Sequence, residues 1–362
     1  MSSPPQTSNE AISRRDVIRT GVALGGALML GAPAVRASNK SGLGPIILGS
    51  GEHQYECTHD WAQLPSDGGI AFGNTHGVAF DKAGNCYIKH TVHATSRKAD
   101  AVCVFDPEGR FVRSFGAEYR GGAHGLHLAR EKDGEFLYLA DCNRGVVQKT
   151  TLTGEVVLDV AWPEASGLYG GKGEYKPTNI AVVTSGPSAG DFYVADGYGK
   201  NWIHRYNAKG EYQGSFGGPG KERGQVSCPH GIAVDERSGT PTLVVADRSN
   251  RRLQTFTLDG RHLSFVTVEM RLPCHFDVRG DLLLVPDLES RVTLLGKDNT
   301  LVVHLGDGMQ DGGPGGSIRG EAREKFVPGK FICPHSAAFD NRGNIVVVEW
   351  VEVGRVTRLR KV

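Results

Sequence analysis

The sequence has almost no net charge, because its 41 basic side chains are matched by 40 acidic ones. Proteins that bind nucleic acid or an anionic membrane surface usually present a strongly basic face, so this balance argues against both kinds of partner. The chain also lacks the run of about 20 apolar residues that a membrane span needs. Its best candidate, Gly21 to Leu30, is short and rich in glycine.

That apolar run belongs to a predicted targeting segment. Arg14 and Arg15 precede it, and the small residues Ala34 and Ala37 follow it, as in a twin-arginine export signal. An uncleaved anchor is the alternative, which the length of the run disfavours. We therefore expect a signal peptide at residues 1–37, a soluble mature domain at residues 38–362 with a net charge of about −1, and a periplasmic or secreted location.

The number of cysteines is odd, so they cannot all be paired within one chain. An exported protein can form disulfides, but seven cysteines leave at least one thiol unpaired. Cys86 and Cys103 lie on neighbouring predicted strands and are the favoured pair. Cys228, Cys274 and Cys333 stand just before repeated histidines, and we interpret them as small packing residues rather than soft metal ligands.

What the sequence does contain is an internal repeat. The stretch Pro229-His230-Gly231 has variants at intervals of roughly 45 to 60 residues, the range that is typical of β-propellers. The chain is rich in glycine and proline, and the segments between its turns are short and β-branched or aromatic, as in many short strands. The equivalent positions are His76, His124, Asn179, His230, His275 and His335.

Each repeat unit reads as four strands joined by tight turns. Six units of four strands predict an all-β, six-bladed β-propeller of the NHL-repeat type. The last unit has room for only three strands after His335. The segment at residues 44–61 is therefore predicted to supply the missing outer strand, which closes the ring and removes two exposed sheet edges.

The repeated histidines should point at one axis, because the first strand of every blade lines the central channel. His124, His230 and His335 belong to alternate blades, so they approach the axis with near-threefold symmetry. Three histidines with an open position are typical of catalytic zinc. His76, Asn179 and His275 on the other blades are candidates for outer-shell or substrate contacts. The alternative is that each histidine merely caps a strand.

An acidic residue ends the second strand of most units, and its recurrence favours a structural role in turns. The residues that follow these acids differ between units. Tyr198 is a candidate general acid or base, and Arg248 is a candidate carboxylate ligand. Surface packing for the tyrosine and an ion pair for the arginine are the alternatives. The repeated acids are Asp141, Asp196, Asp247, Asp287 and Glu349.

The order of these motifs resembles the NHL-repeat propellers, and most closely the peptidyl-hydroxyglycine alpha-amidating lyases. The resemblance covers about residues 70–360 and rests on His124-Gly125-Leu126, Ala195-Asp196-Gly197-Tyr198, Pro229-His230-Gly231, Ala246-Asp247-Arg248 and Pro334-His335. It implies that His124, His230 and His335 bind zinc, that Tyr198 is the catalytic tyrosine and that Arg248 is one of two active-site arginines. The implied reaction breaks the N–C bond of a carbinolamide and releases an amide and an aldehyde acid.

Several positions depart from that family. Its second arginine should lie near Lys89 to His93, where Lys89, His90 or His93 would have to substitute. The aspartate that the family uses for calcium is Ser336 here, so we do not expect calcium. The positions of the family's two disulfides hold Tyr175 with Gly199 and Val244 with Thr255, and His76 and His275 are additional. We expect this chain to share the family's scaffold and its three metal-binding histidines, and to act as a monomer. The expected substrate is a small or peptide-derived molecule that can differ from that of the family.

Two other classes of protein share this scaffold. One is a non-catalytic propeller that binds or assembles partners through its channel-mouth loops. The other is a sugar-acid lactonase or polysaccharide lyase, which would need carboxylate ligands for calcium, whereas the inner positions here are histidines.

Overall fold

The computed structural model describes residues 44–266, 270–309 and 318–362. The predicted signal peptide lies outside these residues. The described segments contain strands and short 3₁₀ turns but no α-helix, and none of their helical turns has the length and hydropathy to cross a membrane.

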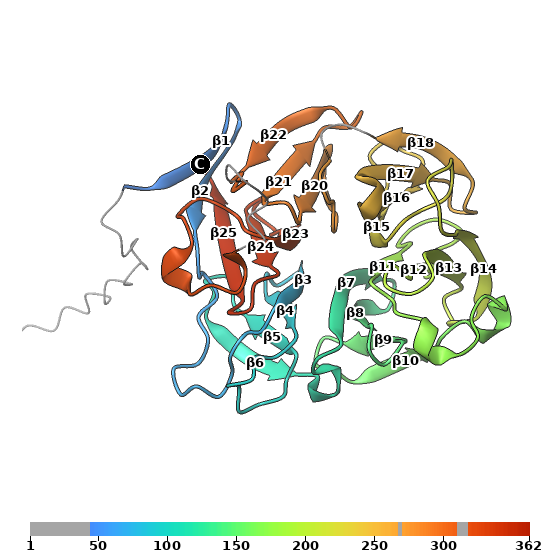
Figure 1. Ribbon diagram of the computed structural model, residues 1–362, viewed down its shortest axis with the longest axis horizontal. Helices are drawn as coiled ribbons and strands as arrows, with labels where there is room; N and C mark the ends of the chain where they lie inside the picture. Colours follow the sequence, from blue (N-terminus) through green and yellow to red (C-terminus); the bar gives the residue numbers. More distant parts are fainter. Residues whose placement is uncertain (1–43, 267–269, 310–317) are drawn as a thin grey trace, which may run out of the picture. The chain divides into compact units, whose positions relative to one another are not determined.

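The strands form six antiparallel sheets, each one a blade, as the repeat predicts (Figure 1). Blade 1 comprises β3 (Thr75–Phe80), β4 (Cys86–His90), β5 (Val102–Phe105) and β6 (Phe111–Phe115). Blade 2 comprises β7 (Ala123–Glu131), β8 (Gly134–Asp141), β9 (Val146–Thr151) and β10 (Val156–Val160). Blade 3 comprises β11 (Asn179–Val182), β12 (Phe192–Ala195), β13 (Trp202–Tyr206) and β14 (Tyr212–Gly217).

The second half of the chain repeats this plan. Blade 4 comprises β15 (Pro229–Asp235), β16 (Thr242–Asp247), β17 (Arg252–Phe256) and β18 (His262–Val266). Blade 5 comprises β19 (Asp277–Arg279), β20 (Leu282–Asp287), β21 (Arg291–Leu295) and β22 (Leu301–Leu305). The 3₁₀ turns are η1 (Ala117–Tyr119), η2 (Glu164–Ser166), η3 (Lys172–Glu174), η4 (Arg248–Asn250) and η6 (Arg323–Lys325).

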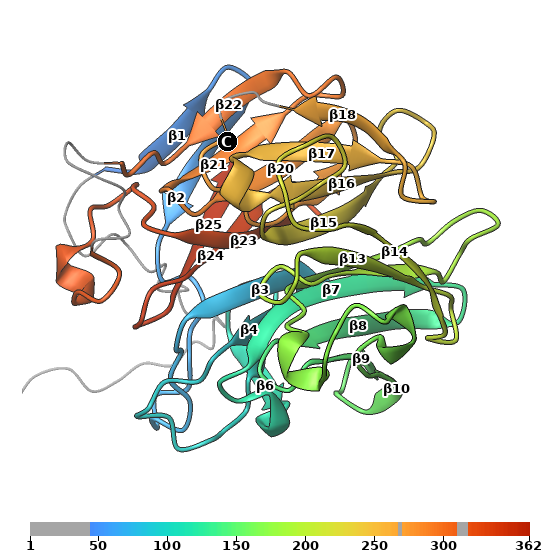
Figure 2. The same ribbon diagram turned by 45° about the vertical axis from the view of Figure 1, so that its right-hand side comes forward.

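Blade 6 joins the two ends of the described chain. Its sheet has the order β1-β2-β25-β24-β23, so two N-terminal strands pair with three C-terminal ones. The N-terminal strands are β1 (Ile46–Ser50) and β2 (His53–Thr58), and the C-terminal ones are β23 (Pro334–Phe339), β24 (Ile345–Glu349) and β25 (Arg355–Lys361). Figure 2 shows β2 beside β25. The predicted closure is confirmed, with one strand more than expected.

Hydrophobic side chains from neighbouring blades pack together and hold the ring. Between blades 3 and 4, for example, Tyr193 and Ile203 pack with Ile232 and Val245, all at most 1 % exposed. Each fully buried side chain of this kind stabilises the fold by roughly 1.5–3 kcal/mol. The nearly continuous apolar runs of the middle strands, such as β5 and β12, are thus buried on both faces of each sheet.

The glycine after a repeated histidine allows the innermost strands to approach each other. A Cβ added at Gly125 would lie 2.5 Å from the carbonyl oxygen of Thr178 in blade 3. A Cβ at Gly231 would lie 2.5 Å from the carbonyl oxygen of Cys274 in blade 5. Both contacts are closer than any real Cβ allows, so the repeat requires glycine for steric reasons.

A β-bulge lies at the repeated histidine in blades 1, 2, 4 and 6. The register between the first and second strands shifts by one residue around His76, His124, His230 and His335. A bulge turns a side chain away from the normal alternation of the strand. In blades 3 and 5 the equivalent residues are Thr178 and Cys274, whose carbonyl oxygens face His124 and His230 as that of His76 faces His335. The predicted equivalence of Asn179 and His275 is therefore wrong, because the strand register places both one residue beyond the repeated histidine.

The repeated acids bond to loops and turns, as predicted, and four of the five hold the loop that enters their blade, whereas Asp141 accepts bonds from its own turn at Asn143 and Arg144. Asp247 accepts a hydrogen bond from the backbone N–H of Ser227 at 2.7 Å, and Glu349 accepts one from Ile332 at 2.7 Å. Each contact fixes the segment just before a repeated histidine. Asp196 and Asp287 bond to the corresponding entering loops.

The predicted disulfide between Cys86 and Cys103 is wrong. All seven cysteines are free thiols. Cys86 pairs with Phe105 across β4 and β5, while Cys103 pairs with Ile88. The two cysteines are therefore diagonal neighbours, about 7–8 Å apart in such a sheet, which exceeds the span of a disulfide.

Candidate metal centre

Four histidine rings meet at the centre of the ring of blades: His76 on β3, His124 on β7, His230 on β15 and His335 on β23. We call them the four-histidine cluster. The ring centroids of His124, His230 and His335 lie 4.7 to 4.9 Å apart, and that of His76 lies 5.0 Å from His124 and 4.6 Å from His335. All four residues are at most 8 % exposed.

Backbone carbonyls of adjacent blades orient three of these rings. The Nδ1 atom of His124 lies 2.6 Å from the oxygen of Thr178, and that of His230 lies 2.8 Å from the oxygen of Cys274. The Nδ1 atom of His335 lies 2.9 Å from the oxygen of His76. Because a carbonyl can only accept, each Nδ1 carries the proton and each Nε2 carries a lone pair. Such outer contacts typically orient metal ligands.

Burial keeps these imidazoles neutral. It lowers the pKa of His124 to about 3, and it holds the pKa values of His230 and His335 well below the ordinary value of 6.5. At neutral pH each ring therefore offers an unprotonated nitrogen. This is the form that binds a metal ion.

The cluster is larger than the predicted trio. The potential ligand atoms of His76, His124 and His335 all lie within 4.8 Å of one another, and these are the only such group among the described residues. His230 stands outside this group, and its Nε2 atom lies 3.0 Å from the hydroxyl of Tyr198. The predicted trio contains two members of the group, and His76, expected in an outer shell, is the third.

Tyr198 and Arg248 lie next to the cluster. The Tyr198 hydroxyl is 3.2 Å from Nε2 of His124, and Nη1 of Arg248 is 3.5 Å from that hydroxyl. Tyr198 is 39 % exposed as a residue, yet its hydroxyl points inward to the buried histidines. Burial raises the pKa of Tyr198 to about 12, and the positive charge of Arg248 opposes that rise. The tyrosine is therefore protonated at neutral pH in the absence of a bound cation.

Within the described part of the chain, the Asn179 side chain forms no hydrogen bond with the four-histidine cluster. It is 3 % exposed, and its Oδ1 atom accepts a hydrogen bond from the N–H of Ile180 at 2.8 Å. The side chain therefore bonds locally within blade 3, and the structure gives it no part in holding the histidines.

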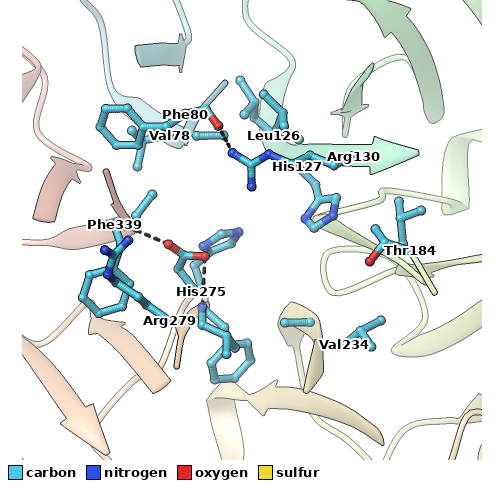
Figure 3. Close-up of a pocket in the computed structure, with 18 of the residues that line it drawn as sticks. Val78, Phe80, Leu126, His127, Arg130, Thr184, Val234, His275, Arg279 and Phe339 are labelled. Atoms are coloured by element: carbon cyan, nitrogen blue, oxygen red, sulfur yellow. Dashed lines mark hydrogen bonds between the residues drawn. The ribbon is translucent and has the colours of Figure 1, made fainter. Parts of the chain in front are cut away.

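His275 belongs to another part of the channel. Its Nδ1 atom lies 3.2 Å from the hydroxyl of Ser336, and its ring lines a cavity of about 370 Å³. Figure 3 shows His127, Arg130, Thr184 and Arg279 around the same space. We call this cavity the His275 pocket. Its lining comes from the later residues of the innermost strands, whereas the cluster comes from their first residues, so the two lie toward opposite ends of the channel.

Lys89, His90 and His93 are not brought to the cluster. Lys89 is fully buried, and its Nζ atom donates to the oxygens of Ala140 at 2.6 Å and Gly125 at 3.2 Å, which ties blade 1 to blade 2. His90 accepts from the N–H of Val92 at 3.1 Å and supports a loop within blade 1. His93 bonds to the hydroxyl of Thr95. None of the three contacts Tyr198 or Arg248 among the described residues.

Arg319 is a second cationic side chain on this side of the channel, and the repeat pattern did not predict it. The guanidinium carbon of Arg319 lies 3.6 Å from the ring centroid of Trp350, and its Nη2 atom donates to Oδ1 of Asn74 at 2.9 Å. Asn74 stands two residues before His76. Trp350 directly follows a repeated acid, as Arg248 does, so its position in the repeat could have marked it as a candidate site residue. Arg319 lies in a long glycine-rich insertion without periodicity, where no pattern indicates a site.

Two curated relatives are named as amidating lyases. The chain is 26 % identical over 196 residues to a probable peptidyl-alpha-hydroxyglycine alpha-amidating lyase of Caenorhabditis elegans, covering 51 % of this chain and 53 % of that protein. It is 26 % identical over 219 residues to peptidyl-alpha-hydroxyglycine alpha-amidating lyase 1 of Drosophila melanogaster, covering 52 % and 38 %. The chain thus matches about half or less of the length of these relatives. No protein-family model matches it.

Solved structures show the same fold at low identity. A gluconolactonase from Xanthomonas campestris has a TM-score of 0.57 at 14 % identity, covering 88 % of this chain and 95 % of that one. A streptogramin B lyase has a TM-score of 0.53 at 12 % identity, covering 84 % and 97 %. The resemblance is confirmed at this level: the chain is a six-bladed propeller with weak homology to the peptidyl-hydroxyglycine amidating lyases.

Proposed function

We propose that the protein is an exported, metal-dependent lyase of the peptidyl-hydroxyglycine amidating type, acting on a small polar or peptide-derived substrate. The observation that carries this proposal is the contact between the Tyr198 hydroxyl and the Nε2 atoms of His124 and His230. It places a proton-transfer group beside a set of converging imidazoles. Distant relatives named as lyases support the same class of reaction.

The residues fit a metal ion. His124, His230 and His335 are neutral, have Nδ1 tied to a carbonyl and present Nε2 to the centre. Neutral imidazoles suit zinc and its neighbours in the first transition row rather than calcium. When bound, such an ion polarises a substrate oxygen and lowers the pKa of a hydroxyl group. Zinc is the ion that the family resemblance implies.

Tyr198 would remove the proton of the substrate hydroxyl. A positive charge within the cluster and the guanidinium of Arg248 both favour the phenolate over the phenol, so they lower the pKa of Tyr198 toward the working range. In the proposed reaction the hydroxyl proton leaves oxygen, a C=O bond forms, the C–N bond breaks and the amide nitrogen gains a proton. Arg248 is positioned to bind a carboxylate of the substrate.

The direct test uses residues 38–362, stripped of metal and reloaded with Zn²⁺. The loaded protein should convert an N-acyl α-hydroxyglycine peptide to the peptide amide and glyoxylate, and the stripped protein should not. Elemental analysis accompanies the assay. Absence of stoichiometric metal would favour a non-catalytic binding propeller, whereas bound metal without turnover would exclude this substrate.

We also propose that residues 1–37 direct export by the twin-arginine route. Replacing Arg14 and Arg15 with lysine should retain the protein in the cytoplasm, as measured by fractionation. Export of that variant at the normal level would contradict this assignment.

A further inference from the structure

We propose that His76 is a fourth metal ligand, so that the centre is a four-histidine site for a divalent transition ion. The inference rests on metal binding in the proposed function and goes beyond it, because the family resemblance supplies only three histidines. It concerns the number of imidazoles that hold the ion.

The first observation is a distance. Nδ1 of His76 lies 3.4 Å from Nε2 of His335. Two nitrogens that bind one tetrahedral ion at 2.0–2.1 Å are about 3.3–3.4 Å apart. For comparison, protein hydrogen bonds from N–H to oxygen are usually about 2.7–3.2 Å long. The spacing therefore matches two ligands of one ion better than a hydrogen bond.

The second observation is the environment of the His76 ring. Its Nε2 atom is buried and has no hydrogen-bond partner in the described part of the chain. Its Nδ1 atom faces His335, whereas Nδ1 of the other three rings faces a carbonyl of the next blade. A buried polar atom without a partner costs about 1–3 kcal/mol. The contact between Nδ1 and His335 is thus the one side-chain hydrogen-bonding contact of His76 among the described residues.

The third observation is that His76 shares the backbone geometry of the other members. The β-bulge that turns His124, His230 and His335 toward the centre is also present at His76. In blades 3 and 5 the same position holds Thr178 and Cys274, because their carbonyl oxygens face His124 and His230 as that of His76 faces His335. Among the described residues, these four histidines are therefore the ones that occupy this position of the innermost strands.

The donor set determines the class of ion. Four neutral nitrogens without a carboxylate or thiolate exclude a calcium or magnesium site and favour zinc, cobalt, nickel or copper. Binding a substrate oxygen as well requires at least five-coordination. Some catalytic zinc sites reach this number, and Cu²⁺ and Ni²⁺ adopt tetragonal geometries readily.

The test counts ligands in the Co²⁺-loaded protein by proton NMR. Each coordinated imidazole keeps one N–H proton, which the paramagnetic ion shifts far outside the usual range. We expect four shifted exchangeable signals in the wild type and three in His76→Asn, with Co²⁺ bound at least about tenfold more weakly, since even loss of an outer partner costs about 10–100-fold. Asparagine is the replacement of choice because it is polar and uncharged, as the neutral imidazole is, and has no ring nitrogen.

His275→Asn is the matched control and should keep all four signals and the wild-type affinity. Three signals in the wild type, unchanged in His76→Asn, would overturn the fourth ligand while leaving the proposed function intact. Four signals without turnover of the hydroxyglycine peptide would support the fourth ligand and reject the proposed reaction. Failure of every sample to bind Co²⁺ stoichiometrically would reject both.

Discussion

The two ends of the channel contain similar residue types in different arrangements. At one end His124 and His230 contact a single hydroxyl, that of Tyr198, at 3.2 and 3.0 Å. At the other end His127 and His275 line a cavity of about 370 Å³. Burial lowers the pKa values of these two rings to about 4 and about 3, so they are as neutral as the cluster.

The two ends differ in whether their imidazole nitrogens face a common centre. In the four-histidine cluster, carbonyls fix the protonated nitrogens and leave the lone pairs facing one another. In the His275 pocket no group of three potential ligand atoms comes within 4.8 Å, among the residues that the structure describes. Asp277, whose pKa burial raises to about 6, instead accepts backbone N–H bonds from Val278 and Phe339. A larger cavity therefore does not mark the better site for a metal ion.

The largest expected effect is loss of metal from His335→Ala. The His335 ring lies 4.6 to 4.9 Å from the other three rings, so its removal takes away a residue that contacts every member of the cluster. We expect no stoichiometric metal by elemental analysis after dialysis, while His275→Ala retains it. Full metal occupancy in His335→Ala would show that the four-histidine cluster does not hold the ion.

Tyr198→Phe should keep the metal but lose activity. The substitution removes the hydroxyl that contacts two histidines and leaves the ring in place. Loss of a proton-transfer group typically lowers the rate by about 10²–10⁴-fold. The measurement is kcat on the α-hydroxyglycine peptide, and a wild-type kcat would exclude Tyr198 from proton transfer.

Arg248→Gln should weaken substrate binding. A hydrogen bond to a charged group is worth about 1.5–3 kcal/mol, which corresponds to roughly a 10–150-fold rise in KM. Arg279→Gln, in the His275 pocket, is the control and should leave KM unchanged. An equal rise in KM in the two variants would show that the substrate does not bind preferentially at the end that contains Arg248.

The smallest effect concerns stability in acid. The pKa of His275 is about 3 in the fold and near 6.5 when unfolded, so the unfolded state binds more protons between these values. The free energy of unfolding therefore falls as pH drops from 6.5 toward 3, by up to about 1.4 kcal/mol per pH unit for each such histidine. His275→Gln should make this decline shallower in chemical denaturation series. An unchanged slope would show that His275 is solvated.

Much of the architecture could be predicted from the sequence. The interval between Pro229-His230-Gly231 and its variants gave the number of blades, and the short last unit gave the closure by residues 44–61. The repeated acids, such as Asp247, were correctly assigned to turns. The disulfide was not predictable, because register decides whether Cys86 faces Cys103 or Phe105, and strand register depends on turn geometry that the cysteines do not reveal.

Repetition in the sequence determined which strands are equivalent, since each blade must bury the same two faces. Only the tertiary structure decided which of the repeated histidines meet. A one-residue bulge lies at His76, whereas Asn179 stands one residue beyond the equivalent position, which Thr178 occupies. His275 lies farther along the channel beside Ser336. The physical reason is that the direction of a side chain depends on local register shifts and on contacts with the adjacent blade. The interval between repeats encodes neither.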